Sequence, residues 1–247
     1  MPHSLLMCFA HPDDESFFAA GTAHKYAAAG VNVVLCCGTR GERGSVGDPP
    51  LATIETLPEV RERELRAAGT IIGVSELVLF DYQDQQLANA PTDAMREHIG
   101  GLIRRHRPDV VITFDPNGGN RHTDHIAISR FTSDAVQCAA DARWRPDLGA
   151  AHRVRRLVWT GGIDAMQQPD LATLRGYPGV DFVIDITASR DIKARALLAH
   201  RTQHEGVNRV FLERPDRDAM LSREVFRLGM GEMPPAVPAD DLYAGLL

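Results

Sequence analysis

Short apolar runs alternate with longer amphipathic segments along most of the chain. Six runs have the apolar, often β-branched composition of buried strands, at residues 4–10, 31–37, 76–80, 109–114, 156–160 and 180–186. Five longer segments have helical patterns, at residues 15–29, 58–72, 92–106, 122–140 and 189–204. Repeated alternation of strand and helix is typical of a mostly parallel sheet. The pattern therefore predicts an α/β fold with such a sheet flanked by helices.

Two segments do not fit this alternation. Residues 39–57 are rich in Gly and Pro and follow a predicted strand, so we expect them at the carboxyl ends of the sheet, where open α/β folds bind ligands. A proline-rich tail begins at about residue 214, and we expect it to pack on the body or on a second subunit of a homo-oligomer. No repeat or low-complexity linker divides the chain, which predicts one domain over residues 1–247.

Composition and charge exclude several classes of protein. The 27 Lys and Arg residues are outnumbered by 33 Asp and Glu, and the net charge of -6 argues against a general nucleic-acid binder. No run approaches the roughly 18 apolar residues that a membrane-spanning helix needs. The four cysteines have no CxxC spacing, and three of them lie in apolar runs, which predicts free thiols and a cytoplasmic location.

An acidic motif stands where the first predicted strand ends and the first helix begins. It reads Ala10-His11-Pro12-Asp13-Asp14-Glu15. By itself, such a motif is consistent with the acidic first turn of a helix, since the helix dipole favours carboxylates there and Pro suits the first position. A histidine beside carboxylates also supplies metal ligands. The motif alone leaves both interpretations open.

A second motif, His122-Thr123-Asp124-His125, follows the fourth predicted strand and a glycine-rich loop at residues 115–120. Histidines three residues apart share a helix face, and alone they fit a capped surface turn as well as a metal site. The loops that follow adjacent parallel strands converge at the carboxyl edge of the sheet, so we expect the two motifs to meet. Two imidazoles and one carboxylate drawn from them would bind zinc with an open position, as in hydrolytic zinc enzymes.

Both motifs, together with Arg61-Glu62-Arg63-Glu64 between them, resemble the PIG-L/LmbE-like family of zinc-dependent de-N-acetylases. The similarity extends from about residue 4 to residue 203. It implies a Rossmann-like fold without a nucleotide and a hydrolase that removes the acetyl group from an N-acetylglucosamine-containing small molecule. It also implies Zn²⁺ as the cofactor, with Fe²⁺ as an alternative that the same ligand types accept.

The resemblance further assigns roles to individual residues. The metal ligands would be His11, Asp14 and His125. Asp13 would be the general base for a metal-activated water, and His122 the acid or oxyanion donor, with Asp124 holding the His122 ring. Two neutral imidazoles and one carboxylate leave the bound ion with a formal charge of +1, so it would remain a strong Lewis acid.

For substrate binding, the resemblance indicates Arg61, Asp84, Glu42 and His200. Each has a simpler alternative: Arg61, for example, could form only an ion pair with Glu64 one helical turn away, and a helical His such as His200 is often structural. The sequence departs from the mycothiol-pathway members of the family at Asn120, where those enzymes carry Tyr. We therefore expect His122 alone to stabilise the oxyanion.

Three other functions compete with this hypothesis. A Mg²⁺-dependent phosphohydrolase could use Asp13 as nucleophile, but the D-x-D spacing is absent and imidazoles suit zinc better than magnesium. A non-catalytic sugar- or nucleotide-binding module would not need Asp13, and no GxGxxG or GxxxxGK sequence occurs. An amidohydrolase acting on a different N-acyl substrate is the nearest alternative in chemistry.

Overall fold

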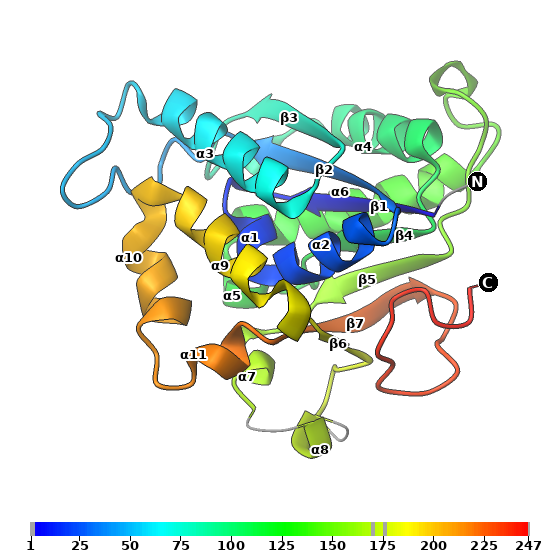
Figure 1. The fold of residues 1–247 in the computed structure, drawn as a ribbon. Helices are drawn as coiled ribbons and strands as arrows, with labels where there is room; N and C mark the ends of the chain where they lie inside the picture. The colour runs from blue at the N-terminus through cyan, green and yellow to red at the C-terminus, as the bar shows by residue number, and fades with distance from the viewer. Residues whose placement is uncertain (1–2, 169–170, 175–176, 247) are drawn as a thin grey trace.

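A mixed sheet of seven strands lies at the centre of the part of the protein that the structure describes (Figure 1). The computed structural model describes residues 3–168, 171–174 and 177–246. In chain order, the strands are β1 Ser4–Phe9, β2 Asn32–Thr39, β3 Glu76–Tyr82, β4 Val110–Thr113, β5 Arg156–Thr160, β6 Phe182–Asp185 and β7 Arg223–Gly231. Their order in the sheet is β3-β2-β1-β4-β5-β7-β6, and β1 to β5 pair in parallel. The α/β class and the single domain are confirmed.

Helices cover both faces of the sheet (Figure 1). α4 and α6 pack together on one face, whereas α2, α3 and α9 pack together on the other. The α-helices are α1 Asp14–Phe18, α2 Ala20–Ala28, α3 Leu57–Ile72, α4 Thr92–His106, α5 Gly118–Arg121, α6 Thr123–Ala140, α7 Ile163–Met166, α8 Leu171–Leu174, α9 Arg190–Ala199, α10 His204–Val207 and α11 Arg217–Met220. None of the helices in the described residues is long and apolar enough to cross a membrane.

The central strand β1 explains why the first apolar run has no alternation. Every residue of β1 is buried, because helices cover both of its faces and strands pair with both of its edges. Strands buried in this way appear as continuous apolar runs. The run therefore ends abruptly at polar residues, where the chain leaves the core at the carboxyl edge of the sheet.

Two predicted helices are each divided in the structure. The helix expected at residues 15–29 is α1 and α2, which meet at Ala19 (φ −142°, ψ 2°). A new helix begins there because Glu224 accepts hydrogen bonds from the backbone N–H groups of Gly21 (3.1 Å) and Thr22 (2.8 Å). The helix expected at residues 189–204 ends at Ala199, and a 3₁₀ turn at Arg201–Gln203 and α10 follow.

Strand β7 was not expected from the sequence, because it lies in the segment interpreted as a tail. It runs antiparallel between β5 and β6. Its charged residue Glu224 is fully buried and pairs with the equally buried Lys193 of α9 (2.6 Å), so the segment does not have the apolar pattern of a core strand. Beyond β7 the chain packs on the body, where Arg156 donates to the carbonyl groups of Glu232, Leu242 and Ala244.

Candidate active site

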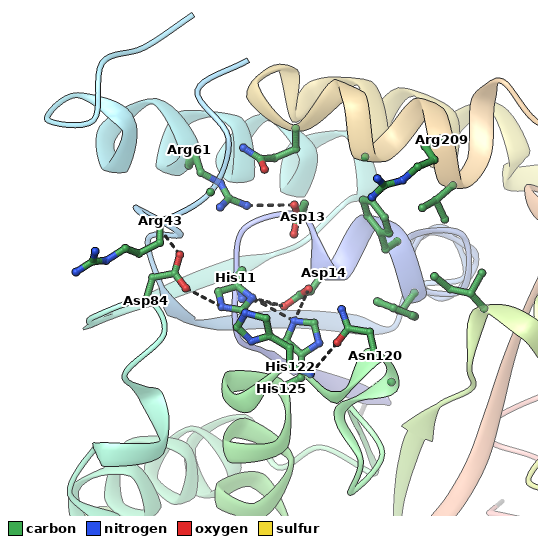
Figure 2. A pocket seen from close by; sticks show the side chains of 18 of the residues that line it. His11, Asp13, Asp14, Arg43, Arg61, Asp84, Asn120, His122, His125 and Arg209 are labelled. Atoms are coloured by element: carbon green, nitrogen blue, oxygen red, sulfur yellow. Dashed lines mark hydrogen bonds and ion pairs between the residues drawn. The ribbon is translucent and has the colours of Figure 1, made fainter. Parts of the chain in front are cut away.

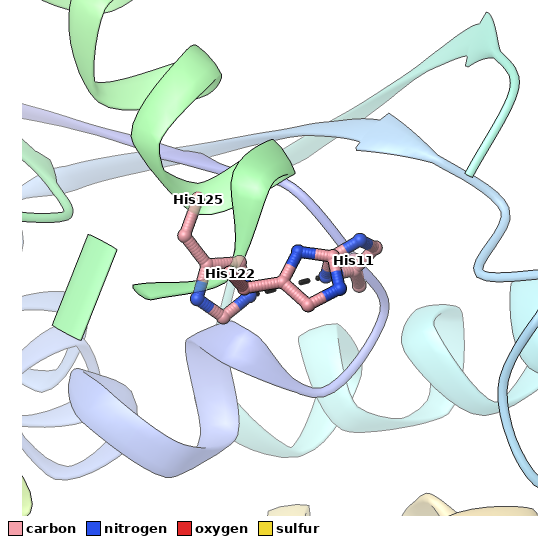
Figure 3. Close-up of side chains that lie close together, drawn as sticks. All are labelled: His11, His122 and His125. Carbon is pink, nitrogen blue, oxygen red and sulfur yellow. Dashed lines mark hydrogen bonds between the residues drawn. The ribbon is translucent and has the colours of Figure 1, made fainter. Parts of the chain in front are cut away.

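Both sequence motifs lie at the carboxyl edge of the sheet, where the loops after β1 and β4 meet. His11 follows β1, and His122 and His125 lie at the start of α6, with their rings gathered against His11 (Figure 3). Because β1 and β4 are hydrogen-bonded neighbours, residues more than 100 positions apart in the sequence become adjacent. A cavity of about 610 Å³ opens at this point (Figure 2). Eight of its lining residues are His11, Asp13, Asp14, Arg61, Asp84, Asn120, His122 and His125.

Three donor groups converge at the floor of the cavity. His11 Nδ1 lies 3.2 Å from His125 Nε2, and the Asp14 carboxylate places Oδ1 3.3 Å from His125 Nε2 and Oδ2 3.7 Å from His11 Nδ1. A tetrahedral zinc ion at about 2.0–2.1 Å from its ligands separates them by about 3.3–3.4 Å. The two separations from His125 Nε2 are close to this value, so His11, Asp14 and His125 could together hold one divalent cation.

Second contacts orient each of these three side chains. His125 Nδ1 lies 3.0 Å from the Gly118 carbonyl, which holds the proton on that nitrogen and leaves the Nε2 lone pair facing His11. The ring also stacks on Phe114, with centroids 3.9 Å apart. Asp14 Oδ2 accepts from the backbone N–H groups of Ala10 (3.1 Å) and His11 (2.8 Å), so Oδ1 is the freer oxygen. Such contacts fix the tautomer and direction of metal ligands.

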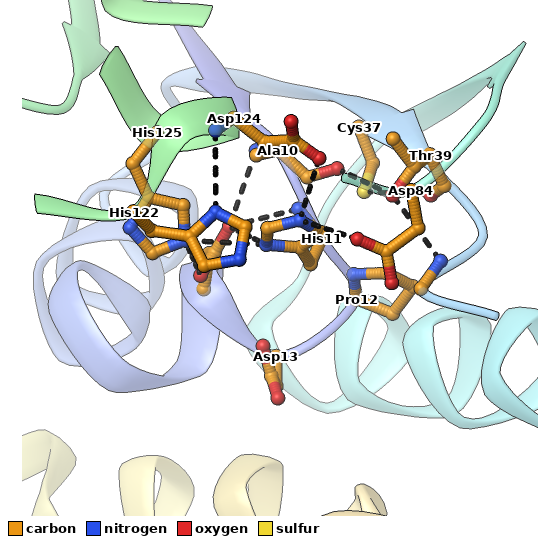
Figure 4. Close-up of polar contacts among 12 residues, drawn as sticks. Ala10, His11, Pro12, Asp13, Cys37, Thr39, Asp84, His122, Asp124 and His125 are labelled. Atoms are coloured by element: carbon orange, nitrogen blue, oxygen red, sulfur yellow. Dashed lines mark hydrogen bonds and ion pairs between the residues drawn. The ribbon is translucent and has the colours of Figure 1, made fainter. Parts of the chain in front are cut away.

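His11 is oriented by two carboxylates. Its Nε2 lies 3.1 Å from Asp84 Oδ1 and 3.3 Å from Asp124 Oδ2 (Figure 4). Burial lowers the pKa of His11, but the hydrogen bonds with Asp124 and Asp84 and the charge of Asp14 outweigh it and raise the pKa to about 10. Burial likewise raises the pKa of Asp14, yet the nearby His125 and His11 bring it down to about 2. The arrangement without metal thus attracts a positive charge, which a proton on His11 supplies.

His122 offers a second ligand set with His11 and His125, since one nitrogen of each ring lies within 4.8 Å of the others. In the set with Asp14, the two separations that join a donor to His125 Nε2, at 3.2 and 3.3 Å, are close to those around a tetrahedral ion. His122 Nδ1 accepts a hydrogen bond from the Asp124 backbone N–H (3.2 Å), so the proton of the neutral ring is on Nε2. Burial and the neighbouring His11 and His125 hold the pKa of His122 below its ordinary value.

The structure corrects the expected role of Asp124. Its carboxylate does not pair with the His122 ring: it accepts from the backbone N–H groups of Gln85 (2.6 Å) and Leu87 (3.1 Å) and from His11. The spacing of two residues brings the Asp124 backbone, rather than its side chain, to His122, because Asp124 lies in the first turn of α6. Asp124 therefore orients His11 and anchors the loop after β3.

Asp13 lies at the cavity wall beside the three donor groups, in a strained backbone conformation (φ 120°, ψ −28°). Arg61 clamps it: the guanidinium contacts Asp13 Oδ2 at 3.1 Å and also donates to the carbonyl groups of Pro12 and Gly41. Burial raises the pKa of Asp13 to about 6, although the Arg61 charge opposes this shift. Asp13 is thus a carboxylate at neutral pH that can both take and return a proton.

The four residues expected to bind substrate divide into two pairs. Arg61 and Asp84 line the cavity, although both are largely occupied by contacts within the protein. Glu42 is not among the residues that line the cavity, and it accepts a hydrogen bond from the Asp84 backbone N–H (2.7 Å). His200 is fully buried against Glu15 (2.8 Å), which contradicts a direct substrate contact. Neither side chain lines the cavity, because Glu42 contacts the loop after β3 and His200 contacts α1.

Several residues at the cavity were not singled out by sequence, among them Phe17, Asp164 and Arg209. Phe17 lies two residues beyond the acidic motif, so its place in the wall could have been inferred from α1. Arg209 is exposed and lies over the cavity in Figure 2, and nothing in its local sequence marks it, because it comes from a short π-helix at Asn208–Leu212 far along the chain.

The chain is similar to known proteins over most of its length. Residues 6–136, just over half of the chain, match the PIG-L family, described as GlcNAc-PI de-N-acetylase. This range includes both histidine motifs and Arg61. The chain is 31% identical over 290 residues to a 1D-myo-inositol 2-acetamido-2-deoxy-alpha-D-glucopyranoside deacetylase of Streptomyces scabiei, a match that covers 99% of the chain and 90% of that relative.

Two further relatives extend the similarity. A deacetylase of the same description from Rhodococcus jostii is 35% identical over 238 residues, covering 81% of each protein. Among solved structures, a conserved protein from Thermus thermophilus superimposes with a TM-score of 0.72 at 28% identity, covering 98% of this chain and 100% of that one. The similarity spans the whole sheet and both histidine motifs, and the chain therefore belongs to the PIG-L family of metal-dependent de-N-acetylases.

Proposed function

We propose that this protein is a zinc-dependent hydrolase that removes the N-acetyl group from an N-acetylglucosamine-containing conjugate. The observation that carries the proposal is the convergence of His11 Nδ1, His125 Nε2 and the Asp14 carboxylate at the floor of a cavity, beside the Asp13 carboxylate, which lies outside the ligand set. The relatives named as deacetylases of a glucosamine-inositol compound support the sugar as the substrate class.

Zn²⁺ is the proposed cofactor, held by His11, Asp14 and His125. Nitrogen and carboxylate donors at these separations suit zinc and also Fe²⁺, whereas they suit Mg²⁺ poorly. When bound, the metal supplies a Lewis acid that polarises the acetamide carbonyl and makes water a nucleophile at neutral pH.

Asp13 acts as the general base in this proposal. A water molecule attacks the acetamide carbon while Asp13 accepts its proton, and the same proton then passes to the amine as the carbon–nitrogen bond breaks, releasing acetate. A pKa of about 6, raised by burial, is close to the working pH, which favours a group that must do both. Arg61 holds the carboxylate in place throughout.

His122 stabilises the oxyanion as a neutral donor. Its Nδ1 is occupied by the Asp124 backbone N–H, so Nε2–H is the proton available to a developing negative charge. Since its pKa lies below the ordinary value, a neutral imidazole is the expected form at pH 7. One donor of this kind contributes about 10²- to 10³-fold to the rate.

The cavity supports a conjugate larger than a single sugar. Its volume of about 610 Å³ lies in the middle of the range of about 300–1,000 Å³ that is typical of small-molecule sites. Asp84 and Gln85 line one side and Phe17 lines another, which suits a polyhydroxylated ring with one apolar face.

The four cysteines are free, and we propose a cytoplasmic location on that basis.

The test is a panel of N-acetylated compounds incubated with the zinc-loaded protein, with the released primary amine quantified. The panel should contain N-acetylglucosamine joined to inositol, to a second sugar and to a simple alkyl group, and N-acetylated amino acids. Release of amine from the sugar conjugates alone supports the proposal. Release only from the amino acids would support a different amidohydrolase, and no release from any of them, with ligand binding retained, would support a binding module.

A further inference from the structure

A buried pair lies directly behind the proposed base, outside the cavity. His200, which follows α9, places Nε2 2.8 Å from Glu15 Oε1 in α1, and both residues have no exposed surface. Neither residue lines the cavity, and neither belongs to the ligand set. Burying charged groups this deeply is costly even when they are paired, so the pair requires an explanation.

The backbone conformation of Asp13 provides an explanation for this buried pair. A non-glycine residue with φ near 120° is strained, and this conformation persists only where its surroundings hold it. Arg61 holds the side chain. The backbone N–H, whose direction follows φ, donates to Glu15 Oε2 at 3.1 Å, so Glu15 holds the main chain.

Glu15 can hold this N–H only while its carboxylate keeps its orientation. Its other oxygen, Oε1, accepts from His200 Nε2 and from the Ser16 hydroxyl (2.6 Å), so Oε1 is held by these two donors and Oε2 remains directed at the Asp13 N–H. His200 Nδ1, by contrast, has no hydrogen-bond partner in the part of the chain that the structure describes. Within the described residues, the His200 ring therefore forms its hydrogen bond with Glu15.

We infer that Glu15 and His200 are positioning residues for Asp13: His200 fixes Glu15, and Glu15 keeps the strained Asp13 backbone in the conformation that directs its carboxylate toward the metal site. The inference rests on the proposed function, because it assigns a purpose to the geometry of the base. If the pair is broken, Asp13 can relax to a common backbone conformation, which moves its carboxylate. A displacement of about 1 Å at a catalytic group can reduce the rate by about 10²-fold.

The experiment compares His200→Leu, which removes the donor, with His200→Gln, whose amide nitrogen can replace Nε2. We expect His200→Leu to lower kcat by about 10- to 100-fold, with KM changed by less than about twofold and the metal content unchanged. His200→Gln should recover most of the rate. The matched control is Thr202→Ala, since Thr202 is buried like His200 and its hydroxyl donates to Glu64 (2.7 Å) without contacting Asp13.

Glu15→Gln tests the same contact from the other side and decides the matter if His200→Leu does not fold. It should lower kcat to a similar degree, and the Glu15→Gln/His200→Gln double variant should be no slower than the slower single variant, because both act through one contact. Normal kcat per bound metal in His200→Leu or Glu15→Gln, or a His200→Gln variant as slow as His200→Leu, would overturn the inference.

Failure of the inference and failure of the proposed function are distinguishable. If the wild-type protein releases amine and Asp13→Asn does not, the function stands whatever His200 does. If neither protein releases amine from the panel, the function itself is wrong.

Discussion

At the residue scale, each proposed metal ligand has one atom for the ion and another bound to the protein. His125 Nδ1 contacts the Gly118 carbonyl, His11 Nε2 contacts Asp84 and Asp124, and Asp14 Oδ2 accepts two backbone N–H groups. These contacts leave His125 Nε2 facing both His11 Nδ1 and Asp14 Oδ1. The proposed ligands are thus oriented without the metal, which would reduce the cost of binding it.

The first prediction concerns the base. Asp13→Asn should keep the metal, because Asp13 lies outside the proposed ligand set, but should lower kcat by about 10²- to 10⁴-fold, since an amide cannot take a proton from water. The measurements are kcat on the best substrate of the panel and metal content of the purified variant. Full activity in a metal-loaded Asp13→Asn protein would exclude Asp13 as the base.

The second prediction separates the two roles considered for Asp124. Since its carboxylate contacts His11, Asp124→Asn should weaken zinc binding by about 10- to 100-fold, measured by competition with a chelator. The control is Asp81→Asn, because the Asp81 side chain is 85% exposed and pairs with Arg40 rather than with a proposed metal ligand. Unchanged zinc affinity combined with a lower kcat would instead support a role for Asp124 through His122.

At the scale of elements, Arg61 of α3 contacts the long loop that follows β2. Arg61 of α3 donates to the Gly41 carbonyl, and its guanidinium lies against Gly41 and Gly44 so closely that a Cβ atom at either glycine would overlap it. Arg61 also contacts Asp13. The glycines of the loop therefore make room for the arginine that holds the base.

The third prediction follows from this packing. Gly44→Ala should displace the Arg61 guanidinium and lower kcat by roughly 10-fold or more, because a misplaced base loses its alignment. Gly101→Ala is the control: a Cβ atom there would meet nothing closer than 3.9 Å, and alanine stabilises a helix by up to about 1 kcal/mol relative to glycine. Equal kcat in the two variants would show that the loop tolerates a shifted Arg61.

The fourth prediction concerns the joint between α9 and β7. Lys193 and Glu224 pair at 2.6 Å with no exposure, and Glu224 also caps α2. Lys193→Met leaves a buried carboxylate without its cation and should lower the free energy of unfolding by about 3–5 kcal/mol. Chemical denaturation measures this loss. Arg143→Ala removes an ion pair with Asp141 at an arginine whose side chain is 90% exposed, and it should leave the free energy of unfolding nearly unchanged.

At the scale of the whole molecule, the site without metal gathers negative charge at the carboxyl edge of the sheet. Asp14, Asp84 and Asp124 surround His11, whose pKa is raised from 6.5 to about 10 because hydrogen bonds with Asp124 and Asp84 outweigh burial. Without a metal, His11 is therefore protonated at neutral pH, and its positive charge balances the surrounding carboxylates.

The fifth prediction is a proton release on metal binding. Zinc at pH 7 should displace about one proton from His11, measured by titration calorimetry in two buffers with different ionisation enthalpies. The His11→Gln variant should neither release the proton nor bind zinc tightly. Zinc binding to the wild type without any proton release would contradict the assigned charge on His11.

A second measurement, the stability of the metal-free protein against pH, tests the same charge on His11. A histidine with a higher pKa in the folded state stabilises it fully below the unfolded value of 6.5, and this contribution is lost as the pH rises through about 10. The Tm of the chelator-treated protein should therefore fall between pH 6.5 and 10, and the zinc-loaded protein should show a smaller fall. A Tm that does not change with pH in the metal-free protein would contradict the raised pKa of His11.

The sequence by itself determined the class of fold and the neighbourhood of the site. Core strands such as β1 are marked by continuous apolar runs, because covering both faces of a sheet requires them. The two histidine motifs each follow such a strand, and parallel strands bring their carboxyl ends to one edge, so the meeting of His11 with His125 could be expected from the sequence for neighbouring strands.

Only the tertiary structure decided the contacts that depend on distant partners. Strand β7 and the break between α1 and α2 both involve Glu224. Its charge interrupts the apolar pattern by which a buried strand is recognised, and its carboxylate caps α2 only once the chain has folded. Likewise, which carboxylate orients His11 and whether His200 reaches the cavity depend on how loops pack, and local sequence does not encode that packing. Periodicity determines which face of an element is buried, whereas the partner of a buried polar group is set by long-range geometry.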